Sequence, residues 1–183
     1  MKNYKINRDD TLFVFLDLQD SLLKAIENRD EILKNSVILA KTAEILNIDS
    51  IITLQYPKGL GGVNKEIHEF IKNAPQIDKA YFSCMRDEKF LEEIKKFGKR
   101  QVVIAGIEAH ICVFQTARDM VDSGLNVFIL SDAVGSRNKK NRENALRQLN
   151  DLGCVVTNIE SILFDLCEVS GTPEFKKVQK LII

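Results

Sequence analysis

The feature that most constrains the fold is a short apolar run that recurs along the chain, each time followed by a stretch with helical periodicity. The first run, TLFVFLDL at 11–18, is almost unbroken, which is typical of a strand buried on both faces. The stretch 29–47 then places its apolar residues on one broad helical stripe. Because a doubly buried strand needs a cover on each face, the sequence predicts a three-layer α/β/α arrangement around a mostly parallel sheet.

The same alternation continues to the end of the chain. We expect further strands at 50–56, 78–84, 100–106, 126–132 and 154–158, and helices at 64–72, 87–99, 111–124, 139–153, 160–167 and 172–182. Strands separated by helices of this length form right-handed βαβ units. No linker or internal repeat interrupts them, so the sequence predicts a single domain over residues 1–183.

Composition excludes several classes of protein. The 26 basic residues balance 26 acidic ones, which argues against a nucleic-acid-binding surface. No apolar stretch approaches the roughly 20 residues that span a bilayer, and the N-terminus lacks the cleavage site of a signal peptide. Four cysteines without a CxxC pair indicate free thiols and a cytoplasmic location.

Candidate catalytic residues lie in or directly after three of the predicted strands, in regions that we expect at the edge where a parallel sheet places functional groups. Asp17 comes after the five apolar residues 12–16 and either caps a turn or is a desolvated proton acceptor. Lys79 lies in the extended stretch DKAYFSC and is either a surface residue or the cation of a pocket. The third candidate is Cys112.

Cys112 stands at the predicted start of a helix, within VVIAGIEAHICVFQTARD. The positive end of the helix dipole and unpaired N–H groups would favour a thiolate there and could hold an oxyanion. The alternative is an inert buried thiol, which is what Cys154 and Cys167 resemble. Cys84 fits either description.

The two histidines and one glycine-rich segment carry weaker signals. His110 precedes Cys112 by two residues, so we expect an orienting or structural role first and a base second. His68 is expected on a solvated helix face. GLGG at 59–62 follows the second strand rather than the first, which argues against a dinucleotide-dependent oxidoreductase.

Taken together, FLDLQ, DKAYFS, GIEAHICVFQTARD and VFILSDAVGSR resemble the isochorismatase-like cysteine hydrolases over nearly the whole chain. The resemblance implies a six-stranded sheet and a catalytic triad of Asp17, Lys79 and Cys112. It also implies a non-proline cis peptide between Ile107 and Glu108. That bond would aim the N–H of Glu108, together with that of Cys112, at one oxyanion.

The resemblance further implies which branch of the family to expect. Isochorismatases proper do not use the cysteine, so Cys112 indicates an amide-like substrate and a thioester intermediate. Nicotinamidases bind a metal through an Asp-x-His pair that TLQYPKGLGGVNKEIHEF lacks, so we expect no metal and no cofactor. We expect a small-molecule substrate and a homo-oligomer. The expected substrate-pocket residues are Gln19, Gln55, Tyr56 and Phe82. Two alternatives stay open: a non-catalytic binding or scaffold protein that retains the fold, and a nicotinamidase-type amidase.

Overall fold

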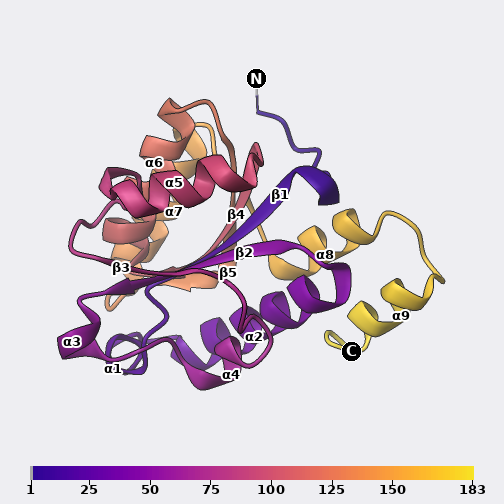
Figure 1. Cartoon of the computed structure of the whole chain (residues 1–183), viewed down its shortest axis with the longest axis horizontal. Coiled ribbons are helices and arrows are strands. Elements are labelled where there is room, and N and C mark those ends of the chain that lie inside the picture. The colour runs from indigo at the N-terminus through magenta and orange to yellow at the C-terminus, as the bar shows by residue number, and fades with distance from the viewer. Residues whose placement is uncertain (1) are drawn as a thin grey trace.

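The computed structural model describes residues 2–183, and its centre is a six-stranded sheet in which all neighbouring strands run parallel. The strands are β1 (Thr11–Leu16), β2 (Asp49–Gln55), β3 (Gln76–Lys79), β4 (Gln101–Ile107), β5 (Asn126–Gly135) and β6 (Val155–Thr157). Their order across the sheet is β3-β2-β1-β4-β5-β6. Helices cover both faces, so the predicted three-layer α/β fold is confirmed (Figure 1).

The two layers of helices lie on opposite sides of the sheet (Figure 1). One layer contains α5 (Glu88–Phe97), α6 (Phe114–Asp122) and α7 (Lys139–Asp151). The other contains α2 (Arg29–Leu46), α4 (Lys65–His68), α8 (Ile159–Cys167) and α9 (Pro173–Gln179). The short helices α1 (Asp20–Leu23) and α3 (Pro57–Leu60) follow β1 and β2.

Strand β1 shows why both faces of the sheet must be covered. All six of its residues are buried. Phe13 and Phe15 pack toward α2 and α8, whereas Val14 and Leu16 pack toward the layer of α5, α6 and α7. Successive side chains of a strand point to opposite faces, so an apolar run in a central strand contributes to two cores at once.

Several predicted boundaries were wrong: the helix expected at 64–72, for example, is α4, which ends at His68. Two of the differences have a clear physical reason. The strand expected at 78–84 is β3, which ends at Lys79. Gln55, the last residue of β2, pairs with Lys79, so the chain beyond Lys79 has no neighbouring strand to join. The strand expected at 126–132 continues to Gly135, because β4 pairs with it again at Gly106 and Ile107 after an irregularity.

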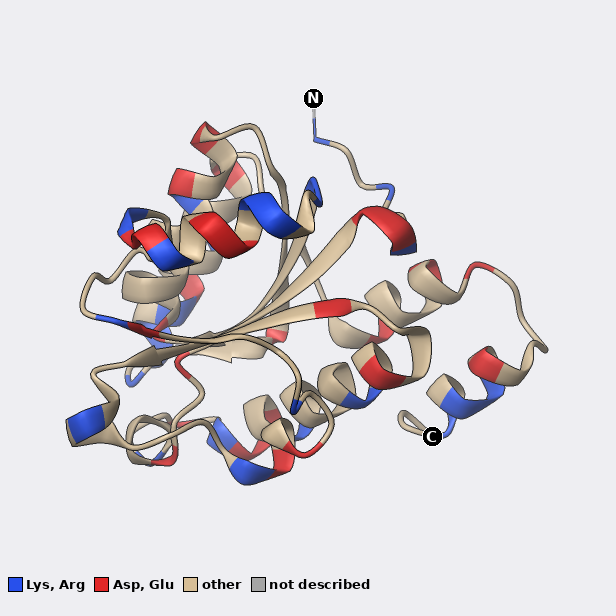
Figure 2. Cartoon of the chain, viewed as in Figure 1, with Lys and Arg blue, Asp and Glu red and all other residues tan. Residues whose placement is uncertain are grey.

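Charged residues lie mainly on the outer sides of the helices, and the strands are almost free of them (Figure 2). Acidic and basic residues alternate over these surfaces instead of forming one large patch of a single sign (Figure 2). Within residues 2–183, no helix has the length and apolar character needed to cross a bilayer. The charged residues within the strands are Asp49, Asp78, Lys79 and Asp132, and only Lys79 among them is buried. Asp17, which follows β1 directly, is buried as well.

Candidate active site

Asp17 marks the edge of the sheet where the strands end, which we call the carboxyl edge. Its backbone is in the left-handed region, with φ of 56°, a conformation that Asp tolerates better than most residues. This turn directs the carboxylate into the protein, where the residue is fully buried. Oδ1 accepts a hydrogen bond from Oγ1 of Thr53 at 2.8 Å, and Oδ2 accepts one from Nζ of Lys79 at 2.7 Å.

Lys79 is an ammonium group whose donors are all directed at acceptors of the chain. Besides Asp17, its Nζ donates to Oε1 of Gln55 at 2.6 Å and to the carbonyl oxygen of Tyr81 at 3.3 Å. Burial is the largest influence and favours the neutral amine, but the charge and hydrogen bond of Asp17, together with the sulfurs of Cys84 and Cys112, outweigh it and raise the pKa of Lys79. Lys79 is therefore a fixed positive charge, and both side chains of the ion pair are buried from solvent.

Thr53 is a member of this cluster that the sequence analysis missed. It lies in β2 opposite Leu16 of β1, the residue before Asp17. This register places its hydroxyl beside the carboxylate, and the residue is fully buried. The available signal was a hydroxyl within the otherwise apolar stretch IITL at 51–54, but its role depends on the register between two strands, which the sequence does not reveal.

Cys112 lies beside the same carboxylate, but it follows β4, whereas Lys79 ends β3. Strands β2 and β1 lie between these two strands. It belongs to a π-helical segment, η3 (Ala109–Val113), that continues into α6. The residue is 7% exposed. Burial and the negative charge and hydrogen bonding of Asp17 raise the pKa of Cys112 to about 12, and Lys79 opposes this only in part.

This raised pKa corrects one expectation. We expected the start of the helix to favour a resting thiolate at Cys112. Instead the sulfur stays protonated at neutral pH, because desolvation and Asp17 together outweigh the opposing charge of Lys79. Any nucleophilic role therefore needs a base that removes the proton during attack, and Asp17 is the carboxylate in position to do so.

The link between β4 and η3 brings Cys112 to this edge. A Cβ at Gly106 would collide with the backbone of Leu16, so glycine lets the end of β4 approach β1 closely. The peptide bond between Ile107 and Glu108 is cis. The side chain of Glu108 pairs with Arg137, and its Oε2 lies 3.5 Å from Nδ1 of His110.

His110 bonds outward from the site. Its Nδ1 lies 3.0 Å from Oγ of Ser136, and its Nε2 lies 3.3 Å from Nδ2 of Asn141. These contacts attach η3 to the loop after β5 and to α7, which matches the structural role expected for His110. His68, on α4, contacts Gln76 through its Nε2.

Cys84 lies in the same region as Cys112. It is fully buried in the apolar core that also contains Cys112, at the start of η2 (Cys84–Arg86). Burial raises its pKa to about 12, although the charge of Lys79 opposes the shift. Its backbone N–H donates to Oγ1 of Thr116 on α6 at 3.0 Å. A second thiol therefore borders the cluster formed by Asp17 and Lys79.

The four expected pocket residues are placed in two different ways. Gln19 is fully buried, and its amide bonds the backbone of Gln55 and of Gly61. Gln55 uses its own amide to join Lys79 with the carbonyl oxygen of Ala80. Tyr56 and Phe82, in contrast, are 62% and 54% exposed next to these bonded groups. The glutamines thus brace the carboxyl edge, and the aromatic rings lie at its surface.

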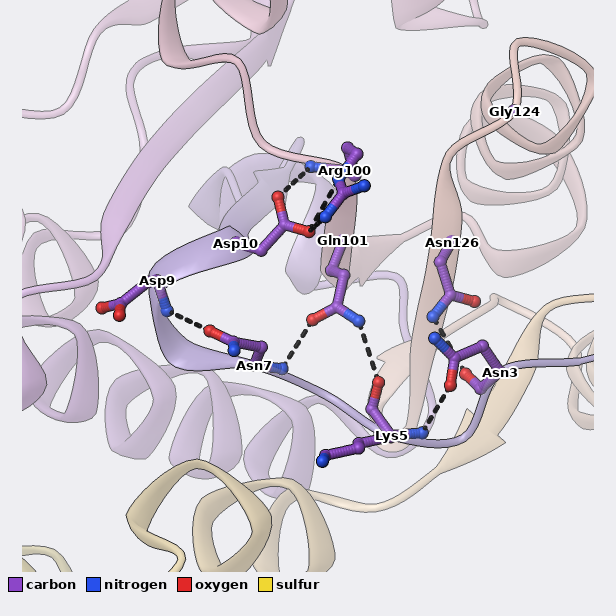
Figure 3. Close-up of a pocket in the computed structure, with 9 residues that line it drawn as sticks. All are labelled: Asn3, Lys5, Asn7, Asp9, Asp10, Arg100, Gln101, Gly124 and Asn126. Atoms are coloured by element: carbon purple, nitrogen blue, oxygen red, sulfur yellow. Dashed lines mark hydrogen bonds and ion pairs between the residues drawn. The ribbon is translucent and has the colours of Figure 1, made fainter.

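The opposite edge of the sheet, which we call the amino edge, holds a cavity of about 630 Å³. Its lining comes from the N-terminal segment and the starts of β4 and β5 (Figure 3). The polar groups there bond one another: Gln101, for example, accepts from the N–H of Asn7 at 2.6 Å and donates to the carbonyl oxygen of Lys5 at 2.8 Å (Figure 3). Among residues 2–183, no group of three or more His, Cys, Asp or Glu side chains is arranged to hold a metal.

Comparison with known proteins agrees with this architecture. The MAR1 ribonuclease from Caenorhabditis elegans is 38% identical, with a TM-score of 0.91 over 97% of this chain and 92% of its own. The YcaC protein from Pseudomonas aeruginosa, solved with hexane-2,5-diol and covalent acrylamide, is 25% identical, with a TM-score of 0.92 over 99% and 93%. The YcaC gene product of Escherichia coli, described as an octameric hydrolase of unknown specificity, is 22% identical, with a TM-score of 0.93 over 100% and 93%. At 22% identity, the similarity to the E. coli protein shows only that the two proteins share a fold.

The fold and these relatives define the class of protein: it is an α/β protein with the fold of isochorismatase-like hydrolases. The model of the isochorismatase domain matches residues 11–161. The chain therefore belongs to the isochorismatase family, whose members are generally hydrolases.

Proposed function

We propose that the protein is a metal-independent cysteine hydrolase that cleaves a small amide-like substrate through a thioester. One observation carries the proposal: Lys79 and Asp17 form a buried ion pair of 2.7 Å, and the thiol of Cys112 lies against the same carboxylate. A desolvated base beside a nucleophilic atom is the arrangement that covalent catalysis requires.

In the proposed reaction, Asp17 takes the thiol proton as the sulfur of Cys112 forms a bond with the carbonyl carbon. The N–H groups of Glu108 and Cys112 donate to the resulting oxyanion. The carbon–nitrogen bond then breaks, and the proton on Asp17 passes to the leaving amine or ammonia. Water attacks the thioester, Asp17 accepts a proton from it, and release of the acid returns the proton to the sulfur.

Lys79 holds the base in place in this scheme. Its contacts with Asp17, Gln55 and the Tyr81 carbonyl occupy its donors, so it stays a cation throughout the cycle. The positive charge stabilises the ionised form of Asp17 in a buried setting and compensates the negative charge that forms on sulfur. Thr53 fixes the other carboxylate oxygen.

One relative supports the presence of a nucleophile that small molecules can reach. The Pseudomonas protein holds covalent acrylamide, a small electrophilic amide. By analogy, we infer that this chain has a site where a small amide can reach a nucleophile. We place Tyr56 and Phe82 at the mouth of that site, where their exposed rings could contact a bound substrate.

The proposal also covers assembly and location. The E. coli relative is described as octameric, and we propose that this chain forms a homo-oligomer as well. We propose a cytoplasmic location, because three of the free cysteines are buried thiols that a reducing compartment would preserve.

The relative from C. elegans is called a ribonuclease, so RNA is the contrasting substrate class. The balance of 26 basic and 26 acidic residues does not favour a polyanion, and Lys79 already has its acceptors within the chain. We therefore favour a small neutral substrate.

The test is a screen of small amides, ureido compounds, esters and one RNA oligonucleotide, run with the wild-type protein and with Cys112→Ala. We expect turnover of an amide or ureido compound by the wild type, none by Cys112→Ala, and an acyl adduct on Cys112 by mass spectrometry. Cys154→Ala, which removes a thiol outside the cluster, is the matched control and should stay active. Activity that survives in Cys112→Ala, or cleavage of RNA alone, would overturn the proposal.

A further inference from the structure

Two of the sequence motifs end in residues that the proposed reaction does not use. DKAYFS ends at Ser83, and GIEAHICVFQTARD ends at Asp119. In the structure these two residues contact each other: Oγ of Ser83 donates to Oδ2 of Asp119 at 2.6 Å. Ser83 is fully buried and the side chain of Asp119 is 20% exposed, so this hydrogen bond is largely shielded from water.

The contact joins two parts of the site that the sheet alone leaves apart. Ser83 ends the loop that begins directly after Lys79, whereas Asp119 lies on α6, the helix that continues from Cys112. β3 and β4, which precede these parts, are separated in the sheet by β2 and β1. A second hydrogen bond, from the N–H of Cys84 to Thr116, reinforces the connection.

Asp119 is held in an ionised form for this contact. Burial alone would raise the pKa of Asp119, but the hydrogen bond from Ser83 and the guanidinium of Arg118 lower it below its ordinary value. Arg118 donates to Oδ1 through Nε at 2.9 Å and through Nη2 at 2.8 Å, so Oδ2 is left to Ser83 and to the more distant Arg86. A hydrogen bond to a carboxylate is stronger than one between neutral groups.

The loop between Lys79 and Ser83 links this contact to the ammonium of Lys79. Between Lys79 and Ser83 lie Ala80, whose carbonyl oxygen accepts from Gln55, and Tyr81, whose carbonyl oxygen accepts from Nζ of Lys79. If the far end of the loop shifts, the acceptor at Tyr81 shifts with it, and the ammonium loses part of its fixed geometry.

We propose that Ser83 and Asp119 are positioning residues, which hold the loop of Lys79 against the helix of Cys112 and so keep the ion pair aligned with the thiol. This inference rests on the proposed function. Neither residue touches the reacting atoms in this account. Their effect passes through Lys79 to Asp17, which also faces Cys112 and Cys84.

The experiment measures the second-order rate of alkylation of Cys112 by iodoacetamide, resolved by mass spectrometry, between pH 4 and pH 9. We expect Ser83→Ala to lower this rate about fivefold to tenfold at pH 7, because the loop then holds the ammonium of Lys79 less firmly beside the carboxylate that takes the thiol proton. The acid limb of the profile should move to higher pH, because a base that loses alignment with its cation takes up its proton more easily. The melting temperature reports folding in parallel.

Ser123→Ala is the matched control. Its hydroxyl also bonds Asp119, but through the backbone carbonyl at 2.8 Å on the exposed side of α6. We expect a wild-type rate and acid limb for this variant. Asp119→Asn keeps an oxygen that can accept from Ser83 and should retain more of the rate than Asp119→Ala. In Ser83→Ala combined with Asp119→Ala, the two losses should not add.

The outcomes separate this inference from the proposed function. Alkylation of wild-type Cys112 that is no faster than that of Cys167 would contradict the nucleophile assignment itself. If wild-type Cys112 reacts first but Ser83→Ala and Asp119→Ala keep its rate and its acid limb, the positioning role is overturned and the hydrolase proposal stands. Should Ser83→Ala fail to fold, the comparison of Asp119→Asn with Asp119→Ala decides: equal rates contradict the inference.

Discussion

The two edges of the sheet each hold an ion pair, and the pairs differ in ways that matter for function. At the carboxyl edge, Lys79 and Asp17 are 2.7 Å apart with side chains that are 0% and 1% exposed. At the amino edge, Arg100 and Asp10 are 3.0 Å apart with side chains that are 83% and 24% exposed. Only the first pair is removed from water, where charges interact strongly.

The presence of a large cavity does not by itself identify the reactive site. The amino edge has the cavity of about 630 Å³, yet its polar groups are bonded to one another at a solvated surface (Figure 3). The carboxyl edge places the thiol of Cys112 beside a buried carboxylate and an ammonium. Burying two charges can cost more free energy than their pairing returns, so a buried ion pair beside a thiol is a candidate for a functional site.

The largest expected difference between the edges is in stability. Lys79→Met leaves the carboxylate of Asp17 buried and unpaired, and we expect a loss of about 3–5 kcal/mol in the free energy of unfolding. Arg100→Met removes an exposed pair, which is worth at most about 1 kcal/mol. Urea denaturation of both variants measures the contrast. Adding Asp17→Asn to Lys79→Met should recover much of the lost stability. Equal losses for Lys79→Met and Arg100→Met would contradict the expected difference between the two ion pairs.

The next difference is in reactivity. Asp17→Asn keeps a side chain of similar size but removes the proposed base. It also removes the charge that raises the pKa of Cys112, but the thiol then lacks the carboxylate that would accept its proton during attack, so we expect alkylation at pH 7 to slow by about 100-fold or more. Asp10→Asn makes the same change at the amino edge and should leave the rate unaltered. Site-resolved alkylation kinetics give both numbers. A similar rate in all three proteins would mean that Asp17 does not activate the sulfur.

A smaller difference in stability is expected between variants of two buried threonines. Oγ1 of Thr53 donates to the Asp17 carboxylate at 2.8 Å, whereas Oγ1 of Thr11 donates to the neutral carbonyl of Asn7 at 2.6 Å. Because hydrogen bonds to charged groups contribute about 1.5–3 kcal/mol and neutral ones about 1, Thr53→Val should destabilise more than Thr11→Val. Chemical denaturation checks the order. The reverse order would argue that Asp17 is not charged in the folded protein.

The smallest effect is an alkaline loss of stability at the carboxyl edge. The pKa of buried Cys84 is about 12 in the folded state, whereas the pKa of a thiol in the unfolded chain is about 8.5. Stability from the protonated thiol is complete below about pH 8.5 and is lost as the pH rises toward 12, with roughly 1–2 kcal/mol lost by pH 10. Cys84→Ala should reduce the fall in unfolding free energy between pH 8 and pH 10. An unchanged slope would show that Cys84 ionises normally when folded.

Much of the carboxyl edge was predictable from the sequence, because the ends of parallel strands meet at one edge. Asp17 follows one apolar run, Lys79 lies in an extended stretch and Cys112 follows the apolar run of β4, and the structure brings these residues together. The sheet with helices on both faces followed from the same runs. These features depend on local patterns and on a general rule of topology.

Other parts depend on register and on packing between distant segments. The place of Thr53 beside Asp17 comes from the pairing of β1 with β2, and the contact of Ser83 with Asp119 comes from a loop that crosses to α6. The high pKa of Cys112 reflects burial and a neighbouring carboxylate, neither of which a helix position reveals. Such effects arise only when the chain is folded.

The most direct test of the nucleophile is a competition among the four cysteines for iodoacetamide at pH 7, followed by mass spectrometry. Cys167 is the more accessible thiol, and accessibility alone ranks it before Cys112, which is 7% exposed. We predict the opposite order, with Cys112 modified first because Asp17 withdraws its proton, and with the fully buried Cys84 and Cys154 modified last. Modification of Cys167 ahead of Cys112 would contradict the account.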